Sequence, residues 1–343
     1  MTTFVLLHKR MSKIVITGGA GFLGSQLGHS LHKDNHEVIL IDDLSFGYRD
    51  NLIIDGQTFG TFILDDIRNP NLSQYLDGVD VVIHFAAIAA LPVNQSEPMR
   101  AFSVNVAGWA NVLEACRKAK IAKVIFASTS AVYENNIVFP FTETDTVSPY
   151  LAYSMTKKHA EDIALSYVKL YDMDICLPRF FNLYGPHCDY RRKSPPLISY
   201  IIKSLMMNEQ PILHSDGLQS RDYVYVEDVC RMCKLLINSD KTKGEIFNVA
   251  SNSTITMNEI YSEIASLLQS NIKPVFRNPN LLWDKYHELN QGFAINPLYI
   301  SKETNKFSQG SFEKARTVLG WKPKVSFKEG IMETVEYAKR LGL

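Results

Sequence analysis

The stretch KIVITGGAGFLG, residues 13–24, decides the fold. Residues 13–17 form a short run rich in β-branched apolar side chains, which is typical of a buried parallel strand. Gly18, Gly21 and Gly24 then follow at intervals of three residues, and Phe22 and Leu23 begin a helical pattern of apolar residues. A strand, a glycine turn and a helix in this order form the context in which a glycine loop binds a dinucleotide.

Each glycine of the loop has a task in such a site. Gly18 permits a tight turn, Gly21 lets the backbone approach phosphate groups, and Gly24 lets the helix pack closely on the strand. The first backbone amides of the helix then point at the anion. A lone match of this kind also occurs in glycine-rich turns that bind no cofactor, so the next strand matters.

That strand, residues 38–41, ends in two acidic residues, Asp42 and Asp43. An acid about 20 residues beyond the glycine loop can bind the 2′-hydroxyl of the adenosine ribose, and it repels a 2′-phosphate. The pattern therefore favours NAD over NADP. The alternative for Asp42 is a solvated turn residue.

The composition excludes several classes of protein. The 343 residues are 46% hydrophobic, and 36 basic residues balance 36 acidic ones, so neither nucleic acid nor an anionic membrane is an expected partner. No apolar run approaches the length of a membrane span, and residues 4–7 are too short for a signal-peptide core. The five cysteines suit a reducing cytoplasm, and we expect the Cys230/Cys233 pair to pack inside a helix.

Apolar runs alternate with helical patterns along the first half of the chain, which predicts an α/β fold with a doubly wound parallel sheet of the Rossmann type. The expected helices include 104–119 and 153–171. The expected strands are residues 13–17, 38–41, 61–64, 79–85, 123–128 and 174–177.

After Gly185-Pro186 this alternation stops. We expect strands near 223–226 and 246–249, a polar irregular stretch at 278–309 that comes before the segment 312–319, and a final helix near 329–340. This pattern predicts a smaller C-terminal α/β substrate-binding lobe. The expected division is a dispensable N-terminal extension (1–10), an NAD-binding domain (11–185, with a returning segment near 222–250) and the lobe (mainly 186–343).

Tyr153 and Lys157 lie one helical turn apart. A tyrosine with its ordinary pKa of roughly 10 needs nearby positive charge to act as a base near neutral pH. Lys157 can supply that charge and can also bond the nicotinamide ribose. Thr129 follows an expected strand, whose end faces the cofactor crevice, so its hydroxyl can bond the same substrate oxygen. The alternatives are a packing tyrosine, a solvated lysine and a threonine that caps a strand end.

With these features the chain resembles the extended short-chain dehydrogenase/reductases, and in particular the NAD-dependent nucleotide-sugar epimerase/dehydratase family typified by UDP-glucose 4-epimerase. The likeness runs from about residue 13 to residue 337. Its motifs are TGGAGFLG (17–24), DIR (66–68), HFAA (84–87), NVAG (105–108), STSAVY (128–133), the Tyr153/Lys157 pair, RFFNLYGP (179–186), DGLQSRDYVYV (216–226) and LGWKP (319–323).

The resemblance implies a role for each matching residue. Tyr153 would be the base, Lys157 its partner and Thr129 the second hydroxyl of the catalytic group. Asn182 and Arg221 would bind the phosphates of the substrate, and His214 would cover its base. The cofactor would be bound by Gly18, Gly21, Phe22, Leu23, Gly24, Asp42, Asp43, Asp66, Ile67, Phe85, Ala86, Ala87, Asn105, Ser128, Tyr153, Lys157 and Phe180.

For Arg221 the alternative is an ordinary ion pair with Asp222 or Asp228. The resemblance implies no metal site.

The absence of acidic residues just after Thr129 suggests which reaction of the family this chain would catalyse. Dehydratases of the family carry an acidic pair at the next two positions, and decarboxylases often carry Glu at the second of them; here Ser130 and Ala131 stand there. A 4-keto sugar would therefore take the hydride back on its other face, which is 4-epimerisation. Val93 stands where enzymes acting on uronic acids or acylamino sugars can carry Arg, which favours a neutral hexose.

We therefore expect a cytoplasmic, homodimeric UDP-hexose 4-epimerase. The alternatives are a decarboxylase, dehydratase or C4 dehydrogenase of the same family, and a non-catalytic NAD-binding regulatory protein. Three departures from the family pattern stand out: Glu134 and Ser215 each replace a usual Gly, and a second phosphate-binding arginine is missing near residues 296–310. Lys302 and Lys306 are both candidates to replace that arginine.

Overall fold

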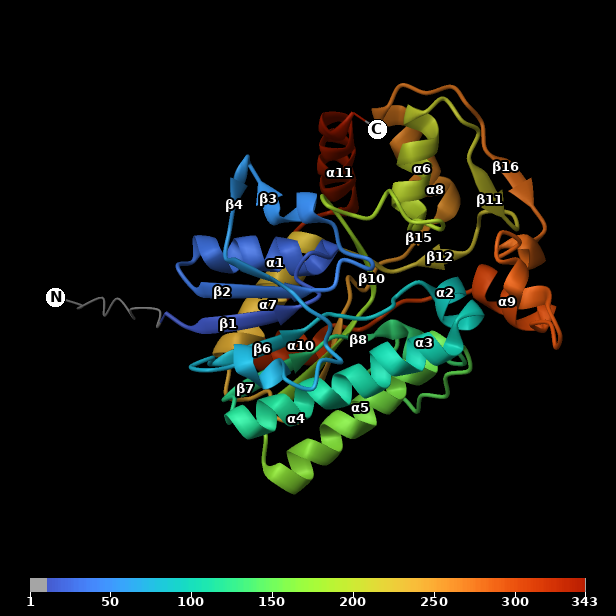
Figure 1. The fold of residues 1–343 in the computed structure, drawn as a ribbon. Helices are drawn as coiled ribbons and strands as arrows, with labels where there is room; N and C mark the ends of the chain where they lie inside the picture. Colours follow the sequence, from blue (N-terminus) through green and yellow to red (C-terminus); the bar gives the residue numbers. More distant parts are fainter. Residues whose placement is uncertain (1–10, 343) are drawn as a thin grey trace.

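A parallel sheet forms the centre of the molecule in the computed structural model, which describes residues 11–342 (Figure 1). The expected N-terminal extension, residues 1–10, lies outside the described residues. The strands follow the order β14-β9-β7-β6-β1-β2-β5, and β8 pairs with β9. Their bounds are β1 Lys13–Thr17, β2 Glu37–Asp42, β5 Thr61–Leu64, β6 Val81–His84, β7 Lys123–Phe126, β8 Ser128–Thr129, β9 Ile175–Phe180 and β14 Ile246–Val249. The expected doubly wound α/β fold is confirmed.

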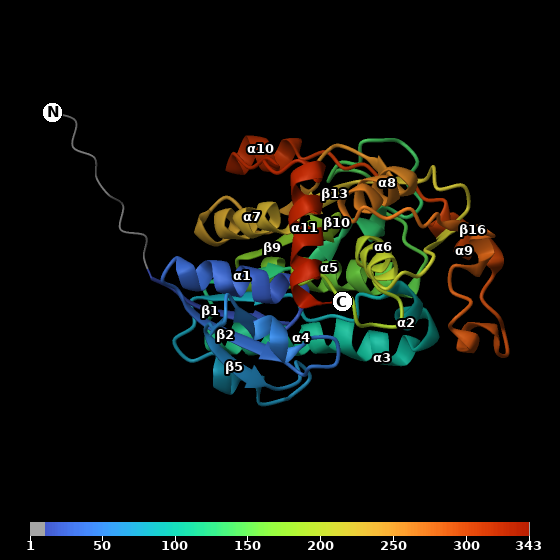
Figure 2. The same cartoon turned by 90° about the horizontal axis from the view of Figure 1, so that it is seen from above.

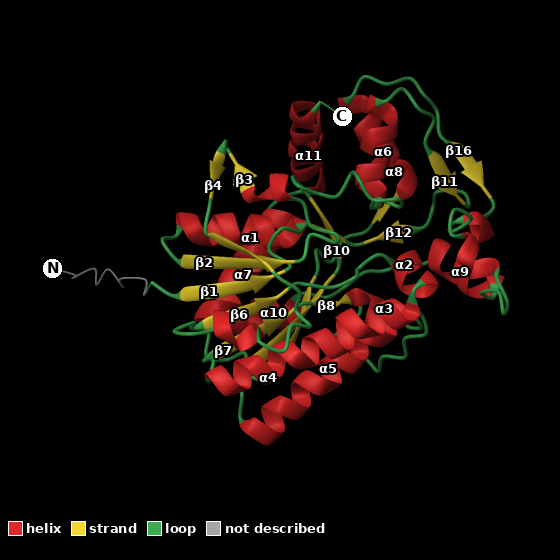
Figure 3. Ribbon diagram, viewed as in Figure 1, coloured by secondary structure: helices red, strands yellow, loops and turns green. Residues whose placement is uncertain are grey.

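Helices cover both faces of the sheet, as Figures 2 and 3 show. One face carries α1 (Phe22–Lys33), α7 (Val226–Asn238) and α10 (Glu313–Leu319), and the other carries α4 (Trp109–Ala119) and α5 (Ala152–Tyr171). The alternation along β1 accounts for this arrangement. Ile14 and Ile16 pack in the hydrophobic cluster of α1 and α7, whereas Val15 packs in the cluster of α4 and α5. Burial on both faces is why the three central residues of the strand, 14–16, are all apolar.

The strand order determines where a ligand can bind. Strand β1 lies between β2 and β6, so the chain runs outward from β1 in both directions. In sheets of this kind, ligands bind at the carboxyl ends of the strands where the order reverses. The glycine loop, Asp42 and Thr129 all follow the carboxyl ends of strands, so the fold brings them to one edge.

The elements after residue 185 that do not join the central sheet or its covering helices, among them α6, α8, β11 and β16, form the upper right part of Figure 1. Helix α8 packs against both α6 and α11. The helices are α6 Leu197–Met206, α8 Met257–Leu267 and α11 Phe327–Leu341, and the short strands are β10 Asn182–Tyr184, β11 Ile212–His214, β12 Ser220–Arg221, β13 Tyr223–Tyr225, β15 Ile255–Thr256 and β16 Val275–Arg277. These strands form the two-stranded pairs β10–β13, β11–β16 and β12–β15.

Smaller elements complete the described chain. They are η1 Arg49–Leu52, the antiparallel pair β3 Ile53–Ile54 and β4 Gln57–Thr58, η2 Leu72–Tyr75, α2 Leu91–Ser96, α3 Pro98–Phe102 and η4 Ser130–Tyr133.

The stretch 278–309 differs from the expected irregular segment. It contains η5 (Pro279–Leu281), η6 (His287–Asn290) and α9 (Pro297–Thr304). Trp283, Tyr286, Leu289 and Ile300 form a small hydrophobic cluster with Leu151, the residue just before α5. These apolar residues follow no helical or strand period, so the pattern alone did not reveal that they share a core.

The expected helix 104–119 also begins differently. Residues 103–108 form a π-helical segment, η3 (Ser103–Gly108), before α4. Asn105 lies in this segment with its side chain buried, and its amide bonds the backbone of Ile88 and the hydroxyl of Thr156. Segments of this kind often occur at functional sites.

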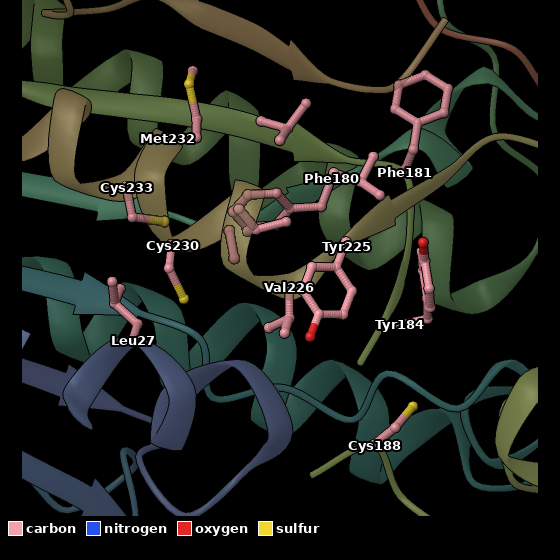
Figure 4. Packing of buried hydrophobic residues seen from close by; sticks show 14 of the residues in the cluster. Leu27, Phe180, Phe181, Tyr184, Cys188, Tyr225, Val226, Cys230, Met232 and Cys233 are labelled. Carbon is pink, nitrogen blue, oxygen red and sulfur yellow. The ribbon is translucent and has the colours of Figure 1, made fainter. Parts of the chain in front are cut away.

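The largest hydrophobic cluster joins α7 to α1 and to the strands around Tyr225 (Figure 4). Cys230 and Cys233 both lie buried in it, and burial raises the pKa of each thiol. The packing interpretation of this pair is therefore confirmed. In the described part of the chain, no helix is long and apolar enough to cross a membrane.

A buried ion pair connects α5 to β9. Arg179 donates two hydrogen bonds of 2.8 Å to Glu161, and the two side chains are only 4% and 1% exposed. Arg179 also donates to the hydroxyl of Tyr133 (2.8 Å), and Ser128 donates to Glu161 (2.5 Å). All four side chains therefore belong to one satisfied network.

Replacing Arg179 by Met should lower the free energy of unfolding by about 3 to 5 kcal/mol, because it leaves Glu161 buried without its partner. Urea unfolding followed by circular dichroism measures the loss. The control is Arg316→Met, which breaks an exposed pair with Glu313 and should cost less than about 1 kcal/mol. Equal losses in the two variants would contradict the assigned importance of the buried pair.

Candidate active site

The glycine loop lies against two neighbouring strands. Gly18 has a left-handed backbone (φ +72°), and its N–H donates to the carbonyl of Ile41 at 2.8 Å. A Cβ at this position would lie 2.6 Å from the backbone nitrogen of Ala86, and one at Gly24 would lie 2.1 Å from the carbonyl oxygen of Gly18. Side chains at either position would force the backbone apart. Gly21 is the N-cap of α1, so the loop exposes the first amides of that helix without a side chain in front of them.

Asp42 and Asp43 differ in their surroundings. Asp42 is 8% exposed and accepts hydrogen bonds from the N–H groups of Ala20 (3.1 Å) and Leu44 (2.8 Å). Burial raises the pKa of Asp42, and these two hydrogen bonds oppose the shift. Asp43 is bonded instead by the backbone and hydroxyl of Ser45. Asp42 is thus the carboxylate held rigidly against the glycine loop.

A cleft of about 100 Å³ lies between this loop and the ends of β2, β5 and β6. Many of the expected cofactor-binding residues line it: Gly18, Gly21, Asp42, Asp43, Asp66, Ile67, Phe85, Ala86 and Ala87. Asp66 is also paired with Arg68, which lowers the pKa of its carboxyl. Phe22 and Leu23 open α1 beside the cleft. Phe180 packs edge-on against Phe85, with ring centroids 6.2 Å apart.

Two expected cofactor residues are engaged elsewhere. Asn105 is 2% exposed and braces Ile88 against Thr156 of α5, and Ser128 is 3% exposed and bonds Glu161. Neither lines this cleft. Both therefore support the elements around the cleft from behind.

Tyr153 lies in the first turn of α5, and the side chain of Thr129 accepts the backbone N–H of Ala131 at 3.1 Å. Burial raises the pKa of Tyr153, whereas the neighbouring Thr129 hydroxyl and the positive charge of Arg192 lower it. Lys157 is 4% exposed, and its ammonium donates to the carbonyl of Ala127 at 2.8 Å. Burial lowers the pKa of Lys157 to about 8, and the charge of Glu161 opposes that shift.

Arg192 is a functional candidate that the motifs did not reveal. Its loop turns at Asp189, whose carboxylate accepts the backbone N–H groups of Arg191 (2.8 Å) and Arg192 (3.1 Å). The positive charge of Arg192 lowers the pKa of Tyr153. The available signal was the run of three basic residues, 191–193, just after the Gly-Pro at 185–186.

Glu134 explains one departure from the family pattern. Its side chain is buried, and one carboxylate oxygen accepts the N–H groups of Tyr150 (2.7 Å) and Leu151 (3.0 Å). The other oxygen accepts the hydroxyl of Ser154 in the first turn of α5. A carboxylate at a helix N-terminus accepts hydrogen bonds from free backbone amides and interacts favourably with the helix dipole. Glu134 thus fixes the start of the helix that carries Tyr153.

The expected substrate residues lie away from the first cleft. His214 and Arg221 line a second cleft of about 260 Å³ between α6, β11 and the end of α9. Asn182 donates to the backbone carbonyl of Asp222 at 2.9 Å. The alternative ion pairs of Arg221 are wrong: its nearest described acid is Glu303, at 3.9 Å, while Asp222 bonds backbone groups and Asp228 pairs with Arg231.

The donor set of the first cleft fits a dinucleotide. The bare helix N-terminus suits a pyrophosphate, the rigid carboxylate of Asp42 suits a ribose diol, and the apolar walls suit an aromatic ring. No Lys or Arg lines this cleft in the described part of the chain, and Arg68 is bonded to the cleft residue Asp66. The residues present therefore suit NAD better than a cofactor with an additional phosphate.

Comparison with known proteins places this geometry in a family. Residues 14–250 match the model of the NAD dependent epimerase/dehydratase family, and the chain belongs to that family. The cofactor is therefore NAD. The resemblance stated from the motifs is confirmed.

Several relatives span nearly the whole chain. A putative UDP-glucose 4-epimerase of Methanocaldococcus jannaschii is 31% identical over 329 residues, which cover 95% of this chain and 98% of that one. A human dTDP-D-glucose 4,6-dehydratase is 28% identical over 333 residues, covering 95% and 89%. The solved structure of a UDP-glucose 4-epimerase from Thermotoga maritima with UDP-glucose aligns with a TM-score of 0.85 at 28% identity, covering 96% and 100%. The relatives thus share one family and differ in reaction.

Replacing Glu134 by Ala should reduce turnover roughly 10- to 100-fold, because Tyr153 loses its fixed position beside Thr129. It should also lower the free energy of unfolding by about 1 to 3 kcal/mol, since buried amides lose their acceptor. Steady-state kinetics and urea unfolding measure the two effects.

The matched control is Glu329→Ala, which removes the equivalent carboxylate from the capping box of α11. This variant should lose stability but keep its turnover. If both variants lost stability and neither lost turnover, Glu134 would be a structural cap alone.

Proposed function

We propose that this protein is an NAD-dependent nucleotide-sugar 4-epimerase acting on a UDP-hexose. The observation that carries the proposal is that the Thr129 hydroxyl neighbours Tyr153, with Ser130 and Ala131 following Thr129 in place of carboxylates. The acid that follows, Glu134, is committed to the start of α5. No carboxylate of this segment is thus free to remove a C5 proton or to assist loss of CO₂.

The residues divide the work as follows. Tyr153 accepts the proton of the sugar C4 hydroxyl, and Thr129 holds the same oxygen in place by its own hydroxyl. The charge of Arg192 lowers the pKa of Tyr153 and so favours the phenolate that this step needs. Lys157 holds the end of β7 against α5 through the Ala127 carbonyl and lies beside the expected nicotinamide ribose. NAD, when bound, supplies the hydride acceptor and donor for C4.

The stereochemical outcome follows from the same site. A sugar oxidised at C4 has no acid or base in the 130–134 segment to take it further, so it turns and regains hydrogen on its opposite face. Tyr153 then returns the proton to the C4 oxygen. Because no net oxidation results, the reaction would consume no NAD.

The substrate-binding part of the proposal concerns the second cleft. Arg221 binds the diphosphate, Asn182 supports it, and His214 covers the base; a guanidinium suits phosphate oxygens because it can donate two parallel bonds. The UDP-sugar names of the relatives support this nucleotide. We further propose a division near residue 185 into cofactor and substrate parts, a homodimer through α4 and α5, and a cytoplasmic location.

Two other functions are distinguishable by product. A decarboxylase, dehydratase or C4 dehydrogenase of the same family would release CO₂, a stable keto sugar or NADH. A regulatory protein would bind NAD and change nothing. The chain keeps all three residues of the expected catalytic group, Tyr153, Thr129 and Lys157, and this argues against the regulatory function.

The deciding experiment is an NMR time course of the purified protein, without added NAD, in separate tubes of UDP-glucose, UDP-N-acetylglucosamine and UDP-glucuronate. A new anomeric signal from the C4 isomer would support the proposal and identify the sugar. No change in any tube, even after NAD is added, would contradict the proposed UDP-sugar reaction.

Replacing Tyr153 by Phe should slow turnover at least ~100-fold, because the proton acceptor is removed while the ring remains. NAD content, read from the absorbance of the denatured supernatant, should not change. A Tyr153→Phe protein with wild-type turnover would make the mechanism wrong.

A further inference from the structure

A carboxylate lies among the positive charges of the substrate cleft. Glu303 is in the last turn of α9, and its side chain is 12% exposed. One carboxylate oxygen lies 3.9 Å from Nη2 of Arg221, and the other lies 3.8 Å from Nζ of Lys306. Arg221 and Glu303 both line the cleft. An acid is unexpected at this point, because the neighbouring guanidinium is the one assigned to the diphosphate.

Charge, and not hydrogen bonding, holds this carboxylate. Both separations are longer than hydrogen bonds, and Oε2 of Glu303 is buried without a hydrogen-bond partner. Arg221 donates instead to the backbone carbonyl of Glu303, at 2.8 Å. The position of the guanidinium therefore does not depend on the carboxylate. A buried anion without hydrogen bonds is poorly solvated. The attraction of Glu303 to Arg221 and Lys306 is therefore easily replaced by that of a phosphate group, which can accept hydrogen bonds from them.

The structure distinguishes the two lysines that could replace the missing phosphate-binding arginine, because their surroundings differ. Lys302 lies over the rings of Tyr150 and Tyr299, at 5.8 and 5.5 Å from the ring centroids. Lys306 has its side chain 13% exposed and faces Glu303 and, by its charge, Glu134. Lys306 thus belongs to the charged group around Arg221, and Lys302 does not.

From this arrangement we infer that Glu303 is a built-in competitor of the nucleotide diphosphate, which sets how tightly Arg221 and Lys306 hold the substrate. The inference rests on the proposed function, since it takes the ligand to be a nucleoside diphosphate. Arg221, Lys306 and Glu303 together carry one positive charge. The incoming phosphates meet the repulsion of Glu303, which lowers affinity and speeds release of product. The repulsion grows with the charge of the ligand and vanishes for a neutral nucleoside.

The test is binding of UDP, UMP and uridine to the NAD-loaded full-length protein, followed by NMR titration. In Glu303→Gln, which keeps the shape and removes the charge, UDP should bind about 10-fold more tightly, because removal of a like charge at short range relieves a few RT of repulsion. UMP should gain less, and uridine should not change. Equal or weaker UDP binding would overturn the inference and make Glu303 a support or a ligand contact.

Matched variants separate this effect from general charge. Glu303→Asp keeps the charge and should bind UDP as the wild type does. Glu313→Gln removes an acid from an exposed pair that is likewise one turn from its cation, and it should have no effect. An equal gain in Glu313→Gln would overturn the inference, since the effect would then be one of net charge.

A second measurement does not depend on the folding of Glu303→Gln. Lys306→Gln should weaken UDP binding and leave uridine unaffected, whereas Lys302→Gln should change neither. Weaker UDP binding in Lys302→Gln together with unchanged UDP binding in Lys306→Gln would overturn the inference.

The proposed function can fail separately. A wild-type protein that binds UDP but does not convert a UDP-sugar would contradict the epimerase reaction alone. A wild-type protein that binds neither UDP nor dTDP would remove the diphosphate site itself, and the assignment of Glu303 with it.

Discussion

The ion pair between Glu161 and Arg179 is the constraint on which the rest of the site depends. It lies inside the protein, where two charges are tolerated only if each finds its partner and further hydrogen bonds. Glu161 is on the helix of Tyr153, and Arg179 is on β9. Ser128, which bonds the pair, is adjacent to Thr129, and Tyr133, which bonds it too, is adjacent to Glu134. One buried network therefore fixes the positions of α5, of the strand that carries Thr129 and of Glu134 relative to one another.

Much of the fold could be predicted from the sequence because its signals are local. The run at 13–17, the glycines and the acids at 42–43 each announce a strand, a turn or a strand end over a few residues, and the structure places them as expected. Helix α5 begins within one residue of its predicted start. That Thr129 lies near Tyr153 was also accessible, since Thr129 ends a strand at the edge of the sheet where the cofactor crevice is expected.

The remaining features depend on contacts between distant parts of the chain, which no local pattern encodes. Glu134 appeared as a departure from a motif, and its task becomes visible only when the turn at 150–151 lies against it. Asn105 was expected to face the cofactor, but a π-helical segment turns it toward Ile88 and α5. The ammonium of Lys157 donates to the carbonyl of Ala127 at the end of β7, and the positive charge of Arg192 lowers the pKa of Tyr153. A list of residues at one site does not tell which of them touch.

The small hydrophobic cluster of residues 278–304 has a consequence for engineering. Trp283, Tyr286 and Leu289 share their core with Leu151, which immediately precedes the helix of Tyr153. The segment that borders the substrate cleft is thus also a buttress of the catalytic helix. Transplanting this segment from a relative to alter sugar preference would disturb the position of the base at the same time, unless the residues around Leu151 were exchanged with it. Under the proposed function, the residues of the substrate cleft and those that place Tyr153 therefore have to be exchanged together.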